Sequence, residues 1–273
     1  MSETGPRQNG RKTRRVTLVT GASGGIGAGL ARVFARHRHG LALVARGRAK
    51  LEALADEIAA SGRPQPLVLV FDWIEQGAAT EIAAALEAAG ATPEILVNNA
   101  GFGLAGEAAR LDPAEQLAIV DLNIRAVVEI TLCFLSAIRA ARGNILNVTS
   151  VAYFPGGPGM AAYASKSFIL SFSLALSQEL PSQGVTVLAL CPGYTKTDFQ
   201  ARAGFGPNMD LACLPGFDRH GGRRGGLCRA DRRTPRDRAW ILEQTQHFAL
   251  AIFAKNPDFS GYFALAAKSG SSP

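Results

Sequence analysis

The hydrophobic residues of the 273-residue chain follow two alternating patterns. Short runs of Val, Leu and Ile without strict polar alternation are typical of parallel strands that are covered on both faces. They predict strands at residues 16–20, 41–46, 67–72, 95–98, 144–150 and 185–191. Ala-rich segments with helical periodicity predict helices at residues 26–38, 49–60, 77–89, 113–142 and 160–180. This alternation predicts an α/β fold, a Rossmann-type doubly wound parallel sheet flanked by helices.

The pattern changes toward the end of the chain. Residues 218–238 are rich in Arg and Gly and lack periodicity, which is typical of loop or disorder. Residues 240–254 can form a helix, and no final strand is predicted. We therefore expect a disordered basic tail at 1–14, an α/β domain at 15–217 and an irregular, poorly ordered segment at 218–273.

The net charge of +7 is concentrated in two places. Residues 1–15 carry a net +4 and residues 218–238 a net +5, so the rest of the chain is slightly negative. This distribution predicts solvated basic segments rather than a basic face on the fold, and therefore no nucleic-acid partner. The alternative is nucleic-acid binding through the two basic segments, which requires an affinity that falls steeply with salt.

The four cysteines, Cys133, Cys191, Cys213 and Cys228, have no metal-ligand spacing and predict free thiols in a reducing compartment. No apolar run reaches the ~18 residues of a membrane span. The N-terminus has no apolar signal-peptide core. We therefore expect a cytoplasmic protein without a transmembrane span or a metal site.

A glycine-rich turn connects the first predicted strand to the first predicted helix. Residues 20–27 read Thr-Gly-Ala-Ser-Gly-Gly-Ile-Gly. Gly21 permits a tight turn, Gly25 lets the backbone approach a pyrophosphate, and Gly27 allows close packing of helix on strand. The helix N-terminus offers free N–H groups to phosphates. The turn therefore predicts dinucleotide binding, because it stands in the strand–turn–helix context that this motif requires.

The second and third predicted strands carry residues that can choose the dinucleotide. A carboxylate that binds the ribose 2′-hydroxyl of NAD is absent after the second strand, where Ala45 is followed by Arg46 and Arg48. A guanidinium can pair with a 2′-phosphate, so NADP(H) is favoured over NAD(H), with solvated arginines as the alternative. Asp72 can accept from the adenine amino group or cap the next helix.

Three further motifs follow in order along the predicted strands and helices. Residues 98–101 read Asn-Asn-Ala-Gly, residues 163–166 read Tyr-Ala-Ser-Lys, and residues 192–197 read Pro-Gly-Tyr-Thr-Lys-Thr. Ser150 precedes Tyr163 by thirteen positions, and Asn123 lies within the long helix before it. Together with the glycine turn, these motifs make residues 15–200 resemble the short-chain dehydrogenase/reductase family.

The residue types fit acid–base chemistry. Tyr163 and Lys166 share a helix face, and the ammonium would lower the pKa of the phenol from ~10. Tyr163 would then act as general acid in carbonyl reduction or as base in alcohol oxidation. Ser150 would donate to the substrate oxygen. Taken singly, Ser150 could cap a helix, Tyr163 fill a core, Lys166 be solvated and Asn123 stabilise a kink.

The resemblance implies a set of site residues. Lys166 would also bind the nicotinamide ribose, Asn123 would hold a water that links Lys166 to solvent, and Asn99 and Gly101 would border the adenosine ribose. The expected catalytic residues are Ser150, Tyr163, Lys166 and Asn123. The expected cofactor-binding residues are Gly21, Ser23, Gly24, Gly25, Ile26, Gly27, Arg46, Arg48, Asp72, Asn99, Ala100, Gly101, Tyr163, Lys166, Pro192, Gly193, Thr195 and Thr197.

We thus expect an NADP(H)-dependent oxidoreductase that moves a hydride between the nicotinamide and a carbonyl or secondary alcohol carbon. The alternative is a non-catalytic NADP-binding sensor on the same fold. An apolar substrate pocket is expected from Phe102, Leu104, Tyr153, Phe154, Met160 and Phe199, with core packing as the alternative for some of them. The family commonly forms dimers or tetramers, which implies a homodimer or homotetramer built on helices 113–142 and 160–180.

One hypothesis accounts for the break near residue 218, namely a shift of the reading frame in the gene. Permitted codons for residues 218–262, read one base later, can encode a short helix pattern, a strand and an apolar C-terminal helix. Several bacterial members of the family end in this way. All expected catalytic residues precede the break, and resequencing the gene tests the hypothesis.

Overall fold

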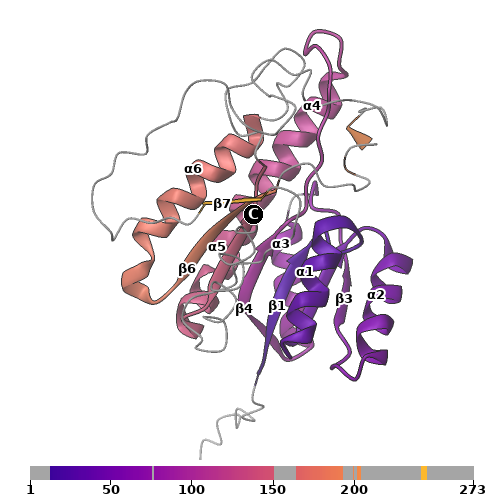
Figure 1. Ribbon diagram of the computed structural model, residues 1–273, viewed down its shortest axis with the longest axis vertical. Helices are drawn as coiled ribbons and strands as arrows, with labels where there is room; N and C mark the ends of the chain where they lie inside the picture. Colours follow the sequence, from indigo (N-terminus) through magenta and orange to yellow (C-terminus); the bar gives the residue numbers. More distant parts are fainter. Residues whose placement is uncertain are drawn as a thin grey trace, which may run out of the picture.

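A seven-stranded parallel sheet forms the centre of the molecule (Figure 1). The strands are β1 Arg14–Thr20, β2 Leu41–Ala45, β3 Leu67–Val70, β4 Ala91–Asn98, β5 Asn144–Val148, β6 Thr186–Pro192 and β7 Ile241–Gln244. They lie in the order β3-β2-β1-β4-β5-β6-β7, so the winding reverses between β1 and β4. The computed structural model describes residues 13–75, 77–150, 164–192, 199 and 202–203, and the backbone of 241–244. The predicted fold class is confirmed.

Helices cover both faces of this sheet. They are α1 Gly25–Arg36, α2 Arg48–Ala60, α3 Ala78–Ala88, α4 Pro113–Val120, α5 Ala126–Ala141 and α6 Ala164–Glu179. One face is covered by α1 and α2, which bury Phe34 and Leu51. The other is covered by α3, α5 and α6, which bury Ile82, Ile130 and Leu176. Within the described ranges, every helix is too short or too polar to cross a membrane.

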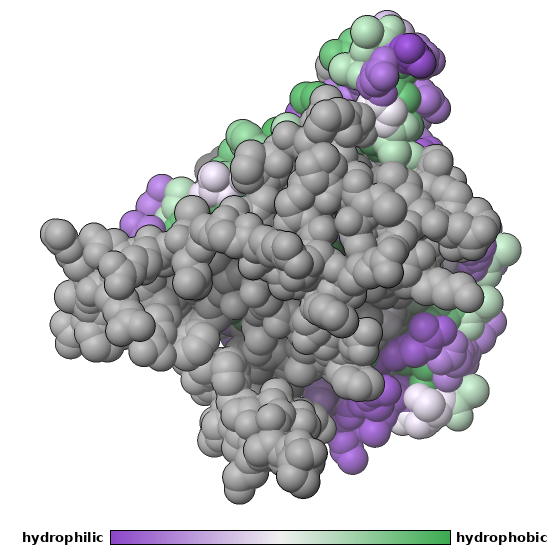
Figure 2. Space-filling model, turned by 45° about the horizontal axis from the view of Figure 1, so that its top comes forward, coloured by the Kyte–Doolittle hydropathy of each residue, from purple (hydrophilic) through white to green (hydrophobic). Residues whose placement is uncertain are grey.

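Polar and apolar side chains intermingle over the coloured part of the surface in Figure 2. Leu132 of α5 and Phe168 of α6 are large apolar side chains that remain exposed. They lie on the two helices for which the sequence predicts subunit contacts. An assembly of this kind stays a prediction.

The predicted helix at residues 113–142 is present but contains a π-helical turn that the sequence did not predict. It consists of α4, a π-helical turn η1 at Asp121–Arg125, and α5. The π turn contains Asn123, which is buried and hydrogen-bonded to the backbone of Phe102 after β4. A π turn takes up one extra residue and thereby rotates the side chains that follow it. It lets Asn123 face the sheet while the apolar face of α5 still packs on the core.

Two expectations near the chain ends also need correction. Arg14, which the sequence assigns to the basic tail, is the first residue of β1 and pairs with Ala91. Residues 241–244, for which a helix is expected, form β7, which pairs in parallel with β6 from Ala189 to Pro192. Without this strand, the backbone groups on one side of β6 would be unpaired at the sheet edge.

A buried chain of polar side chains joins the sheet to two helices. Asn98 of β4 donates to Asn147 of β5 at 2.8 Å and to Thr131 of α5 at 3.0 Å. Asn147 donates to the Ser173 hydroxyl of α6 at 2.8 Å. The hydroxyls of Thr131 and Ser173 in turn donate to the helix carbonyls four residues earlier. These bonds fix β4 and β5 against α5 and α6 just below the carboxyl ends of the strands.

Candidate functional site

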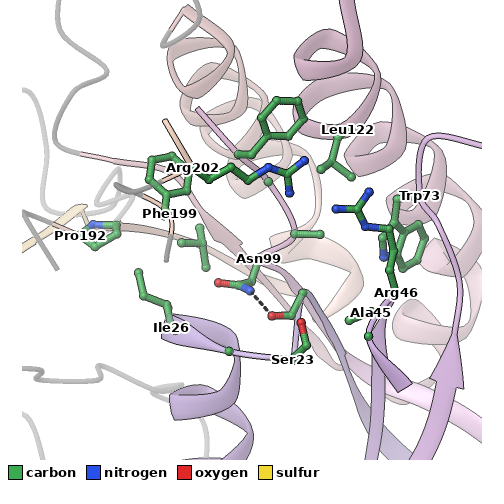
Figure 3. A pocket seen from close by; sticks show the side chains of 18 of the residues that line it. Ser23, Ile26, Ala45, Arg46, Trp73, Asn99, Leu122, Pro192, Phe199 and Arg202 are labelled. Atoms are coloured by element: carbon green, nitrogen blue, oxygen red, sulfur yellow. Dashed lines mark hydrogen bonds between the residues drawn. The ribbon is translucent and has the colours of Figure 1, made fainter. Parts of the chain in front are cut away.

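A cavity of about 580 Å³ opens at the carboxyl ends of the central strands, where parallel sheets of this winding bind ligands (Figure 3). Its walls come from the turn after β1, the ends of β2 to β6, and helices η1 and α6. Most of the expected site residues line it. They are Gly21, Ser23, Gly24, Gly25, Ile26, Arg46, Asp72, Asn99, Ala100, Gly101, Ser150, Lys166 and Pro192.

The glycine turn is anchored to the end of β4. The Asn99 amide donates to the carbonyls of Thr20 at 2.9 Å and Gly21 at 3.1 Å. The Thr20 hydroxyl accepts from the backbone N–H groups of Asn99 and Ala100. Gly21 has a φ of +64°, which favours glycine. Gly24 precedes α1 without a side-chain cap, so the first N–H groups of the helix are available to a phosphate.

Gly27 shows why the turn excludes a side chain at the start of α1. A Cβ at this position would collide with the Gly21 carbonyl and with the Asn99 amide. Both groups are held by the hydrogen bonds that anchor the turn, so neither can move at low cost. The predicted role of Gly27 in close helix packing is confirmed.

Replacing Gly27 with alanine is expected to lower the free energy of unfolding by about 2 kcal/mol, the usual cost of overpacking a rigid site. Gly29→Ala is the matched control, because a Cβ there meets no atom within 4 Å and alanine favours a helix. Urea denaturation of both variants measures the effect. Equal stabilities for the two would show that the turn can yield.

Arg46 and Asp72 face each other at the ends of β2 and β3. An Arg46 Nη1 lies 3.5 Å from Asp72 Oδ2. The other Asp72 oxygen accepts from the backbone N–H of Ile74, and α3 begins after Gly77. The alternative role of Asp72 as cap of this helix is therefore wrong. Arg48 differs from Arg46, since it pairs with Glu52 at 3.3 Å and does not line the cavity.

Lys166 enters the cavity from α6 and is almost fully buried. Its Nζ donates to the Val148 carbonyl at 3.1 Å, and burial lowers the pKa of its ammonium to about 8. Ser150 follows β5 and lines the same cavity. A Cβ at Gly101 would lie 3.4 Å from Lys166 Nζ and 2.8 Å from Asn123 Oδ1. Lys166 and Asn123 therefore approach the backbone after β4 from two different helices.

Asn123 holds the loop after β4 with its side-chain amide. Its nitrogen donates to the Phe102 carbonyl at 2.9 Å and to the Ser165 hydroxyl at 3.0 Å. Its oxygen accepts from the Phe102 N–H at 3.1 Å. Both amide protons are thus donated to protein groups. The Asn123 side chain thus positions the loop beside Lys166. The sequence predicted only that Asn123 holds a water, not this positioning role.

Part of the expected site lies outside the described residues. This concerns Tyr163, Gly193, Thr195 and Thr197, and also Tyr153, Phe154 and Met160 of the expected substrate pocket. Phe102 and Phe199 line the cavity as expected. Leu104 is not part of the cavity wall and packs in a buried cluster with Phe102 and Ile119, so core packing is its role.

The sequence analysis missed several residues that line the cavity, namely Trp73, Lys50, Leu122 and Arg202. Trp73 directly follows Asp72 at the carboxyl end of a strand, and this position alone could have predicted that it lies near the cavity. Its indole N–H is buried and has no acceptor among the residues that the structure describes. Arg202 had no such signal, because it lies in a stretch without periodic pattern.

The comparisons with known proteins match nearly the same part of the chain as the sequence motifs, which lie within residues 15–200. A profile described as short chain dehydrogenase matches residues 15–205. Oxidoreductase UcpA of Salmonella typhimurium is 37% identical over 193 residues, which cover 69% of this chain and 72% of that protein. The matched region ends before residue 218, where the sequence pattern changes.

Two solved structures resemble this fold closely. A short-chain dehydrogenase from Sphingobium yanoikuyae in complex with NADPH is 34% identical, with a TM-score of 0.66, over 72% of this chain and 77% of its own. The 3-ketoacyl-(acyl-carrier-protein) reductase from Brucella melitensis complexed with NADH is 30% identical, with a TM-score of 0.64, over 69% and 78%.

Proposed function

The chain belongs to the short-chain dehydrogenase family, and on this premise we propose that it is an NADP(H)-dependent oxidoreductase acting on an apolar ketone or secondary alcohol. The observation that carries the proposal is one cavity shared by the glycine turn, Arg46, Ser150 and the buried Lys166. A binding module without turnover does not need a buried lysine in the wall of the cofactor cavity. Burial of an ammonium is costly, and such cost is typical of reactive sites.

The residues present fit a nicotinamide dinucleotide. The uncapped N–H groups at the start of α1 suit its pyrophosphate. Asp72 suits its adenine amino group, and the unpartnered Trp73 indole N–H lies in the wall beside it. Lys166 and Pro192 suit the nicotinamide end. When bound, the cofactor supplies or takes up a hydride at its nicotinamide ring.

The protein's own part of the chemistry is proton transfer to the substrate oxygen. We assign the proton to the Tyr163 hydroxyl, which donates it in reduction and removes it in oxidation. The positive charge of Lys166 favours the phenolate form of Tyr163 in the proposed site. Ser150 donates a hydrogen bond to the same oxygen, where negative charge develops. Asn123 holds the backbone of Phe102 in place beside Lys166.

The proposed substrate class follows from the wall of the cavity. Phe102, Leu122 and Phe199 contribute apolar side chains to it. The Brucella melitensis reductase is named for a 3-ketoacyl substrate, which contains a ketone. A purified sample tested with NADPH and NADH against a panel of ketones and aldehydes examines the whole proposal. Cofactor binding without turnover on any of them would favour the sensor.

Replacing Arg46 with alanine is expected to weaken NADPH binding about tenfold while NADH binding changes less than about twofold. A charge-assisted bond to the 2′-phosphate accounts for this magnitude. Arg48→Ala is the control, because Arg48 pairs with Glu52 away from the cavity. Cofactor fluorescence titrations of the wild type and both variants with NADPH and NADH give the six affinities. A larger effect at Arg48 than at Arg46 would contradict the assignment.

A further inference from the structure

Arg202 and Ala203, which follow β6 in the chain, contact the loop after β4. The Ala105 N–H donates to the Ala203 carbonyl at 2.8 Å, and Ala203 itself is buried. The Arg202 guanidinium lies over the Phe102 ring, 4.3 Å from its centroid. Phe102 is held in turn by the amide of Asn123. Arg202 is thus held at the cavity wall by its contact with Phe102 and by the backbone bond of its neighbour Ala203.

Arg202 shares the cavity with Arg46. In Figure 3 the two guanidinium groups point toward the same part of the cavity from different elements. Burial and the charge of Arg46 both lower the pKa of Arg202, while Asp72 and Glu115 act in the opposite direction. Like charges brought together in a partly desolvated place favour an anion between them. Asp72 is paired with Arg46 at 3.5 Å. Its one carboxylate neutralises only one of the two guanidinium groups, so a positive charge remains on this part of the cavity wall.

We propose that Arg202 and Arg46, which face each other across the cavity, together bind the 2′-phosphate of NADP(H). Arg202, which follows β6 in the chain, then helps to select NADP(H) over NAD(H). This rests on the NADP(H) preference proposed above. A phosphate has three acceptor oxygens, so it can pair with two guanidinium groups at once. A single carboxylate, which has two oxygens, pairs less well with both. The stack on Phe102 keeps the Arg202 plane in place, so that little side-chain freedom is lost on binding.

Two other roles for Arg202 are conceivable on the same geometry. It could serve only to pack against Phe102, or it could bind an anionic group of the substrate. The first role affects ligands with and without a 2′-phosphate equally. The second affects neither of them. The two roles are therefore separable from the proposal by adenosine nucleotides that contain no nicotinamide.

The experiment is calorimetric titration of the full chain with adenosine 2′,5′-bisphosphate and with adenosine 5′-monophosphate. We expect Arg202→Gln to weaken bisphosphate binding about tenfold. Monophosphate binding should change less than about twofold. Arg202→Lys should recover part of the loss, because the charge remains and the planar fork is lost. Arg48→Gln is the matched control, with no effect on either ligand.

The outcomes separate this proposal from the one on which it rests. Equal weakening of both ligands by Arg202→Gln would show a packing role and overturn it. A loss confined to Arg46→Gln, with no change at Arg202, would overturn it while the NADP(H) preference stands. Wild-type protein that binds the two nucleotides equally would overturn both. Thermal unfolding of each variant shows whether it is folded.

Discussion

Tyr163→Phe is expected to lower kcat for ketone reduction by about a thousandfold, with NADPH affinity unchanged within about threefold. General acid catalysis by a positioned side chain contributes about 10²–10⁴-fold, and this change removes the proton while keeping the ring. Lys166 remains, so the cavity should still bind the cofactor.

The measurement is steady-state NADPH oxidation with the best ketone of the panel, beside a fluorescence titration of the cofactor. Tyr262→Phe is the matched control, because it lies beyond the residues that match the family. Its kcat should equal that of the wild type. If Tyr163→Phe retained more than about a tenth of the wild-type kcat, Tyr163 would not be the proton donor.

Lys166→Met is expected to change stability in a way that depends on pH. The ammonium of Lys166 has a pKa of about 8 in the folded protein, against 10.5 for an ordinary lysine. Below pH 8 it is charged in both states, and keeping the charge in its buried position opposes folding by about 3 kcal/mol relative to the neutral amine. Between pH 8 and 10.5 the unfolded chain binds more protons, so the stability of the wild type rises with pH.

Methionine has a similar length and no charge, so the variant lacks this rise. At pH 7 it should be more stable than the wild type by about 2 kcal/mol, after about 1 kcal/mol is lost with the bond to the Val148 carbonyl. The difference should disappear or reverse by about pH 10. Urea denaturation at several pH values measures it, with the exposed Lys50→Met as control. A difference that stayed constant with pH would contradict the burial of a charged Lys166.

The sheet and the reaction class could be predicted because their signals are local. Runs of apolar residues and the turn at residues 20–27 fix where strands end and helices begin. Parallel strands then bring Ser150, Lys166 and the residues after β4 to one edge of the sheet. The spacing of these residues along the sequence was therefore enough to place them in one cavity.

What the sequence did not predict depends on contacts between distant segments. The π turn at Asp121–Arg125 has ordinary helical residues, and it is stabilised by the bonds between Asn123 and Phe102. The place of Arg202 in the cavity wall was not predicted for the same reason, because Phe102 from another loop holds it. The pairing of Arg48 with Glu52, one helical turn away, is by contrast a local contact. The shifted reading frame near residue 218 stays a hypothesis.

The buried polar chain from Asn98 to Ser173 also affects how readily Asn147 can deamidate and what deamidation would cost. Ser173 donates its own proton to Ile169, so it can only accept from position 147. Deamidation of Asn147 would replace its NH₂ group by a carboxylate oxygen. This oxygen would face the accepting lone pair of the Ser173 hydroxyl inside the core, with no hydrogen bond between the two. The reaction requires the next peptide nitrogen to fold back onto the side chain. Pairing of β5 with β4 and β6 keeps that backbone extended, so the sheet that needs the amide also preserves it.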